Sequence, residues 1–250
     1  MILYIGLNMK KETTMDILNH PLNSKIKFNA KAHTYTHESG KKFGGVTSFI
    51  KRFKVPFNAQ KQAKSSNKNP NSEWYDMGVK NILSAWKQKG QQSIIMGNAI
   101  HDAIEKSVNE QKKDDDMPYV QDMFWEMMKL HGITPVWCEL VIHNEELELA
   151  SAIDVLGWRG GKYVIIDTKS YEDGLTTKSY NSFLPPIQHL EESKYNYTAL
   201  QTSFYKHWLE TKYGVEVEDT PYCYWNNGGD HELYPMFDLE DEVKLLQEFK

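Results

Sequence analysis

Cysteine is scarce in this 250-residue chain, and its placement excludes several kinds of site. The two cysteines, Cys138 and Cys223, lie far apart and form no CxxC spacing. They are too few for a four-cysteine iron–sulfur cluster or a zinc knuckle, and they argue against a disulfide framework. We therefore expect a protein of a reducing compartment, the cytoplasm, that carries no iron–sulfur cluster.

Long apolar runs and nucleotide-binding motifs are missing as well. No stretch of 18 or more apolar residues occurs, so no membrane span is expected, and the apolar run 1–7 is too short for a signal peptide. A Walker A motif is absent, so we expect no nucleotide cofactor and no ATP motor. Hydrophobic residues make up 40% of the chain, which is ordinary for one large globular domain.

Acidic residues are nearly absent from one part of the chain. Residues 25–68 contain eleven lysines or arginines and one acid, although the whole chain has a net charge of −5. A basic segment on an acidic protein indicates either a surface that contacts a polyanion or a solvated face. If the first interpretation holds, Lys51, Arg52 and Lys54 are candidates for binding nucleic-acid phosphates.

The hydrophobic and turn patterns predict a mixed α/β (α+β) fold, with a small, mostly antiparallel central sheet flanked by helices. Strands are expected at 26–29, 34–37, 135–143, 147–158, 161–169, 216–225 and 231–236. Helices are expected at 47–53, 72–88, 92–110, 117–131, 190–213 and 239–249, and the polar segment 59–70 is expected to be mobile.

The same patterns suggest three regions. Residues 1–24 form an N-terminal extension that we expect to be poorly ordered, and residues 25–90 form a basic region packed on the core. Residues 91–250 form the core itself.

One expected hairpin carries a pair of carboxylates. Gly160-Gly161 separates two β-rich runs, which is the signal of a two-residue hairpin, and symmetric pairing about it places Asp154 opposite Asp167. Opposed like charges destabilise a sheet unless a cation compensates them. Lys169 supplies one positive charge, and a divalent metal would complete the compensation. The alternatives are a solvated ion pair, or a register slip that separates the two side chains.

Two expected helices carry polar stripes at i, i+4 and i+8: Gly97, His101 and Glu105 in one, and Tyr197, Gln201 and Tyr205 in the other. His101 could bind a metal, or could be an interfacial histidine beside a surface Glu105. Gln201 and Tyr205 could bind phosphates or base edges, or could belong to a core stripe.

The order of these motifs resembles a known nuclease family. The chain contains G-xxx-H, S-xx-D, D-x-K and Q-xxx-Y in sequence, at Gly97–His101, Ser151–Asp154, Asp167–Lys169 and Gln201–Tyr205. This order is similar to that of the RecB-like branch of the PD-(D/E)XK nuclease superfamily, with phage exonucleases and the mitochondrial genome maintenance exonuclease as the nearest likeness. The resemblance covers roughly residues 25–236 and implies a restriction-endonuclease-like core. Ser151 stands where the family usually has glycine.

The resemblance implies which residues carry the chemistry. Asp154 and Asp167 would bind Mg²⁺ or Mn²⁺, joined by the backbone carbonyl of Thr168 and a ring nitrogen of His101. Lys169 would orient or activate the attacking water, or balance charge on the phosphate.

Further residues would surround this group. Glu105 would support a ligand or a metal-bound water through a hydrogen bond, and Glu139 would support the site from the strand before the hairpin. Gln201, Tyr205 and Tyr197 would hold the substrate strand near the scissile phosphate.

The resemblance leads to an expected function. We expect a metal-dependent DNA nuclease, most simply a single-strand-preferring exonuclease of replication, recombination or repair. A same-fold endonuclease and a non-catalytic DNA-binding accessory protein remain alternatives. The expected partners are DNA with free or single-stranded ends and other replication or recombination proteins. The many lysines beside only two arginines fit an A·T-rich coding genome such as that of a phage.

Overall fold

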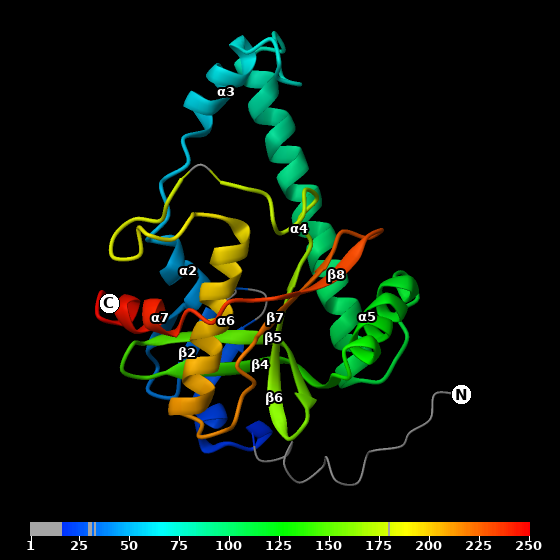
Figure 1. The fold of residues 1–250 in the computed structure, drawn as a ribbon, viewed down its shortest axis with the longest axis vertical. Helices are drawn as coiled ribbons and strands as arrows, with labels where there is room; N and C mark the ends of the chain where they lie inside the picture. The colour runs from blue at the N-terminus through cyan, green and yellow to red at the C-terminus, as the bar shows by residue number, and fades with distance from the viewer. Residues whose placement is uncertain (1–16, 30–31, 33, 180) are drawn as a thin grey trace.

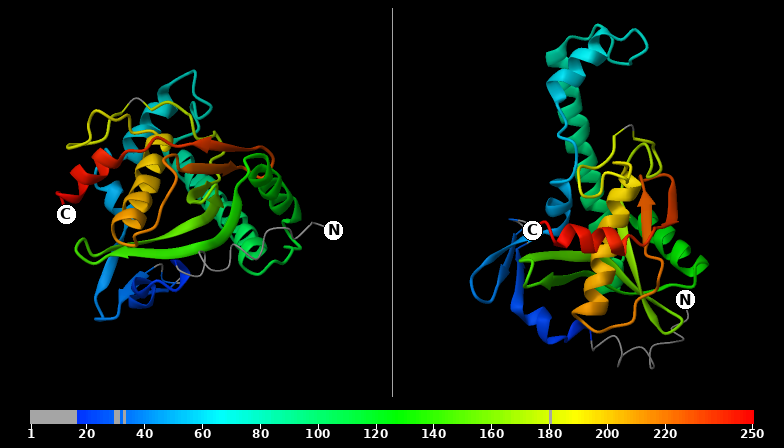
Figure 2. Two further views of the ribbon diagram at one scale, coloured as in Figure 1. Left: turned by 60° about the horizontal axis from the view of Figure 1, so that its bottom comes forward. Right: turned by 60° about the vertical axis from the view of Figure 1, so that its left-hand side comes forward.

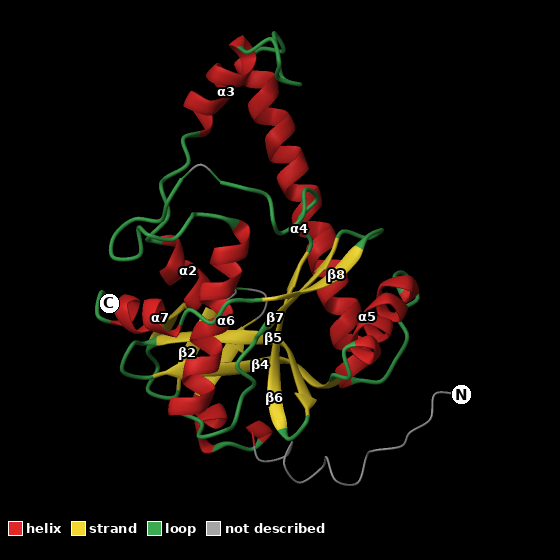
Figure 3. Ribbon diagram, viewed as in Figure 1, coloured by secondary structure: helices red, strands yellow, loops and turns green. Residues whose placement is uncertain are grey.

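The computed structural model describes residues 17–29, 32, 34–179 and 181–250. It shows a mixed α/β protein in which a mostly antiparallel, open sheet is flanked by helices, as predicted (Figures 1 and 3). Most of the expected N-terminal extension, residues 1–16, lies outside the described residues.

The sheet is built from eight strands. They are β1 Ile26–Asn29, β2 Thr34–His37, β3 Lys42–Gly45, β4 Thr134–Asn144, β5 Leu149–Arg159, β6 Lys162–Lys169, β7 Tyr222–Asn226 and β8 His231–Pro235. The path runs β1-β2-β3-β5-β6-β7-β8, and β4 pairs with β5. The β3–β5 and β6–β7 pairs are parallel, and the other pairs are antiparallel.

The predicted hairpin is present with the predicted register. Gly160 and Gly161 both have positive φ angles, 58° and 97°, which glycine adopts without strain, and they let β5 turn back into β6 in two residues. The paired residues run from Arg159 opposite Lys162 to Val155 opposite Ile166. Continued by one step, this register brings Asp154 to Asp167, where the strand pairing stops.

The helices are η1 Pro21–Lys25 (a 3-10 helix), α2 Val46–Lys51, α3 Ala59–Lys68, α4 Val79–Asn109, α5 Pro118–Leu130, α6 Lys194–Thr211 and α7 Glu240–Gln247. Among the described residues, none of these helices has both the length and the apolar character that crossing a membrane requires.

Two helices differ from the prediction. The segment expected to be mobile contains α3, whose first turn is capped by Asn58 through a 2.9 Å bond from the Lys61 amide. The two helices expected at 72–88 and 92–110 are one 31-residue helix, α4, which continues through Gly90 and across the expected boundary after residue 90. One exposed glycine costs a helix only about 1 kcal/mol, so Gly90 does not end it.

Helices cover both faces of the sheet (Figure 2). Phe204 and Trp208 of α6 are fully buried on one face, together with residues of α2 and α7. Ile104 of α4 and Phe124 of α5 are buried on the other face, against Ile166 of β6. Burial of these apolar side chains from water holds the three layers together. The α3 helix and the N-terminal half of α4 extend beyond the layers as an arm (Figure 1).

Candidate metal centre

The sheet forks along one edge of β5, and the fork forms the site. At the start of β5, Leu149 and Ala150 pair with β3, and from Val155 onward the same strand pairs with β6. Residues 151–154 lie between these two partners and have no strand partner on that edge among the described residues. Asp154 therefore lies at an opening in the sheet.

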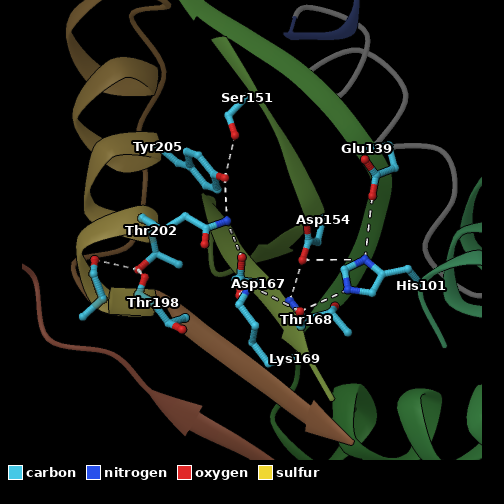
Figure 4. Close-up of polar contacts among 12 residues, drawn as sticks. His101, Glu139, Ser151, Asp154, Asp167, Thr168, Lys169, Thr198, Thr202 and Tyr205 are labelled. Carbon is cyan, nitrogen blue, oxygen red and sulfur yellow. Dashed lines mark hydrogen bonds and ion pairs between the residues drawn. The ribbon is translucent and has the colours of Figure 1, made fainter. Parts of the chain in front are cut away.

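At the fork, β4 and β5 also change which face they present. Cys138 and Val155 pack in the core beneath α4 and α5, whereas Leu140 and Ile153 pack in the core beneath α6. In a regular strand, residues i and i+2 share a face. The change occurs at Glu139, whose φ angle of 58° is in the left-handed region. The Glu139 and Asp154 side chains both lie beside His101 (Figure 4).

A histidine and two carboxylates meet at this point. His101 Nδ1 lies 3.9 Å from Glu139 Oε1 and 3.8 Å from Asp154 Oδ2. One ligand atom from each of the three residues lies within 4.8 Å of the others. Asp154 Oδ2 also accepts a 2.7 Å hydrogen bond from the Thr168 amide, and His101 Nε2 lies 3.1 Å from the Thr168 carbonyl. One imidazole and oxygen donors are a set that fits Mg²⁺ or Mn²⁺.

The charge state of His101 follows from its neighbours. Burial lowers the pKa of the ring, but the negative charges of Asp154 and Glu139 outweigh this effect and raise the pKa to about 9. His101 is therefore a cation at neutral pH in the metal-free protein. A metal that binds to its Nδ1 must displace the proton.

Asp167, which we expected to bind the metal, lies on the α6 side of this group. It is fully buried, and its Oδ1 accepts a 2.7 Å hydrogen bond from Gln201 Nε2 while its Oδ2 pairs with the Lys169 ammonium. Both oxygens therefore have protein partners, and the group of potential ligands contains Glu139 where we expected Asp167. Burial raises the pKa of Asp167 to about 6, although Lys169 lowers it.

Lys169 is a stable cation. Burial lowers its pKa, but the carboxylates of Asp167 and Asp154 raise it well above the usual range of lysine. The ammonium therefore keeps its proton at neutral pH.

Gln201 and Tyr205 make contacts that we did not predict. Gln201 Nε2 donates to Tyr205 Oη at 2.7 Å as well as to Asp167, and Tyr205 Oη lies 2.8 Å from Ser151 Oγ (Figure 4). These bonds fix Asp167 between α6 and β5. Gln201 Oε1 has no hydrogen-bond partner among the described residues. Tyr197 donates to the Thr47 carbonyl at 2.6 Å, so its hydroxyl is also held within the protein.

The remaining candidates lie farther from the group. Glu105 accepts from Asn109 at 3.4 Å, and burial raises its pKa. Lys54 forms an ion pair with Glu192 at 3.5 Å, while Lys51 and Arg52 are exposed, and none of these three lines the cleft.

A cleft with a volume of about 1350 Å³ surrounds His101, Glu139 and Asp154. Its wall includes three lysines that we did not single out, Lys42, Lys89 and Lys194. No spacing rule identifies them, because they come from β3, α4 and α6 and meet only in the folded chain. Gly97 lets α4 approach the end of β6, since a Cβ there would lie 2.8 Å from Ser170 Oγ.

Comparison with known proteins does not assign the chain to a family. No family model matches the sequence, and no curated protein matches it significantly.

Proposed function

We propose that this chain is a metal-dependent DNA nuclease with a restriction-endonuclease-like core of the PD-(D/E)XK type. One observation carries the proposal: His101, Glu139 and Asp154 converge from α4, β4 and β5 at the fork of the sheet. The buried Asp167-x-Lys169 pair lies directly beside them at the end of β6.

The three residues of this group would hold Mg²⁺ or Mn²⁺. When bound, the metal would polarise the phosphodiester, lower the pKa of a water and stabilise the leaving oxygen. Lys169 would neutralise charge on the phosphate as a cation, because its high pKa makes it a poor proton acceptor. Asp167 would hold the Lys169 ammonium in place, and Gln201 would in turn hold Asp167.

The cleft suits an unpaired strand. Lys42 along its wall can contact phosphates, and Lys89 and Lys194 can do so if a phosphate replaces Glu172 and Asp173, the acids with which they pair. The rings of Phe28 and Tyr171 also line the cleft. Stacking on aromatic rings is a common way to bind unpaired bases. These features support a single-stranded substrate, and an exonuclease acting at strand ends is the simplest form of the proposal.

The test is Mn²⁺- or Mg²⁺-dependent degradation of end-labelled single-stranded DNA by the wild type, Asp154→Asn and Lys169→Met. We expect both variants to lose at least 100-fold in rate, because each removes a charge that the reaction requires. Asp122→Asn, on the exposed side of α5, is the matched control and should retain the wild-type rate. Wild-type protein with no activity on linear DNA or RNA with either metal would refute the nuclease proposal. Cleavage of circular single strands would identify an endonuclease.

A further inference from the structure

A second group of potential metal ligands lies at the far end of β4. His37 comes from β2, His143 from β4, and Glu145 follows β4 directly. The Nε2 atoms of the two histidines lie 3.7 Å and 3.8 Å from Glu145 Oε1. One ligand atom from each residue lies within 4.8 Å of the others.

His143 is the residue that points to a ligand. Its side chain has no exposed surface, and neither ring nitrogen has a hydrogen-bond partner among the described residues. A buried polar group without a partner destabilises the folded protein. An apolar side chain of similar size would avoid this cost in the same strand, so the imidazole needs a partner that the protein does not supply.

His37 is prepared for the same partner. Its Nδ1 accepts a 3.3 Å hydrogen bond from the Ser39 amide and lies 2.9 Å from Ser39 Oγ, which holds the ring with Nε2 toward Glu145. An ion that binds Nε2 displaces the proton carried there. The Phe43 ring stacks on the His37 ring, with centroids 5.2 Å apart and an angle of 3°, and fixes its plane.

We propose that His37, His143 and Glu145 bind a zinc ion, separate from the candidate nuclease centre. In tetrahedral zinc sites the bond lengths place ligand atoms about 3.3 Å apart, so each histidine Nε2 would approach Glu145 Oε1 by roughly half an ångström. Two imidazoles and one carboxylate suit Zn²⁺ better than Mg²⁺, which prefers oxygen donors. A water would complete the four-coordinate site.

The two centres are far enough apart to bind metals independently. His143 lies four positions after Glu139 in β4, which corresponds to roughly 13 Å along a strand. The zinc proposal does not rest on the proposed nuclease function. The ion would join β2 to the end of β4 and so fix the β1–β2 hairpin beside the cleft.

Lys25 occupies the carboxylate that zinc would bind, and this offers an independent test. Its ammonium lies 2.8 Å from Glu145 Oε1, the atom that the two histidines approach. In the absence of an ion, Lys25 is the cation at this carboxylate, so it competes with zinc. Lys25→Met should therefore increase zinc affinity several-fold, whereas loss of an ordinary structural ion pair would leave zinc affinity unchanged.

The deciding experiment measures zinc in the untagged, full-length protein after dialysis, together with the absorption spectrum of the cobalt-substituted protein. We expect one zinc per chain, a visible spectrum of four-coordinate Co²⁺, and a zinc-dependent rise in melting temperature. His37→Gln and Glu145→Gln should each lower zinc affinity at least tenfold. These two variants keep the test usable if His143→Asn, at a fully buried position, fails to fold. His189→Gln removes a histidine that pairs with Glu242 at 2.8 Å and belongs to neither group of potential ligands, so zinc affinity should not change.

Asp154→Asn separates the two centres in the same assay. Zinc retained in Asp154→Asn but lost in His37→Gln supports the proposal. Zinc lost in Asp154→Asn but retained in His37→Gln places the ion in the cleft and overturns it, as does wild-type protein that binds no zinc.

Discussion

A single backbone angle at Glu139 determines how the ligands of the cleft meet. The left-handed φ of 58° is unfavourable for a residue with a side chain and costs about 1–3 kcal/mol. Because of this angle, the Glu139 side chain departs from the alternation of faces along β4, and its carboxylate comes within 3.9 Å of His101. Strain of this kind at a cluster of charged groups is typical of functional sites.

The first prediction concerns this carboxylate. Glu139→Gln keeps the size of the side chain but removes a negative charge from the group, so we expect a loss of at least tenfold in Mn²⁺ affinity and a fall in nuclease rate. Calorimetric titration with Mn²⁺ measures the affinity. Glu126→Gln, on the exposed side of α5, is the control. Equal affinity in wild type and Glu139→Gln would exclude Glu139 as a ligand.

Sequence reasoning found Asp154 but not the role of Glu139, for a physical reason. The two-residue turn at Gly160-Gly161 fixes the register of β5 on β6, so counting from the turn locates Asp154 and Asp167. No comparable rule aligns β4 with β5, because the turn between Asn144 and Leu149 has no two-residue glycine signal that would fix where the pairing begins. The sequence therefore placed Glu139 on a strand but not opposite Asp154.

A second prediction concerns Gln201, which donates to both Asp167 and Tyr205. Gln201→Leu leaves the buried Asp167 carboxylate and the Tyr205 hydroxyl without this donor. We expect a loss of about 1–3 kcal/mol in the free energy of unfolding, measured with urea, and a lower nuclease rate. Gln62→Leu, on the exposed face of α3, should change stability by less than about 0.5 kcal/mol. Similar stabilities of Gln201→Leu and Gln62→Leu would contradict the proposed support of Asp167.

Among the elements, α4 matters most to the site because it carries His101 and passes close to the end of β6. The close approach depends on Gly97, where a Cβ would lie 2.8 Å from Ser170 Oγ. Gly90, seven residues earlier in the same helix, has open space at its Cβ position. The two glycines thus form a matched pair within one helix.

The third prediction uses this pair. Gly90→Ala should stabilise the protein by up to about 1 kcal/mol, because alanine favours the helix and meets no neighbour. Gly97→Ala should be less stable than Gly90→Ala, because its methyl group meets Ser170, and it should also lower metal affinity by moving His101. Ser170→Ala removes the obstructing oxygen, so the double variant Gly97→Ala/Ser170→Ala should regain the stability and the metal affinity that Gly97→Ala loses. Urea unfolding of the four variants measures these differences, and equal stabilities of the two alanine variants would show that the approach is not constrained.

The elements that were predicted well are those that are rich in apolar residues. The strands β5 and β6 and the helices α5 and α6 bury such residues, and their ends lie within a few residues of the predicted ones. The α3 helix buries only Ala63, and its sequence contains no apolar residue larger than alanine, so it resembled a polar loop. It forms because Asn58 caps its first turn and α4 packs beside it.

At the scale of the whole molecule, the basic segment 25–68 is partly neutralised by the rest of the chain. Lys25, Lys41 and Lys54 form ion pairs with acids of later segments, at 2.8, 2.6 and 3.5 Å. This accounts for part of the charge imbalance without any partner. The lysines of α3 are exposed at the end of the projecting arm, and they remain available to a polyanion (Figure 2).

The fourth prediction concerns these lysines. Replacing Lys61, Lys64 and Lys68 with glutamine should weaken binding of single-stranded DNA and reduce the slope of log affinity against log salt by up to about 2, because each phosphate contact contributes about 0.7. Fluorescence anisotropy over a range of salt concentrations measures the slope. The control replaces the exposed Lys113, Lys129 and Lys162 and removes the same charge. Equal slopes in the two triple variants would exclude α3 from the DNA-binding surface.

The fork in the sheet has a mechanical consequence. Within the described sheet, the strands β1–β3 and the strands β6–β8 are joined only through β5 and its partner β4. Rotation of one strand group against the other would therefore pivot about the stretch 151–154. Residues at the pivot of a rotation are displaced least, so such a rotation would change the separation of the cleft walls while Asp154 stays nearly stationary.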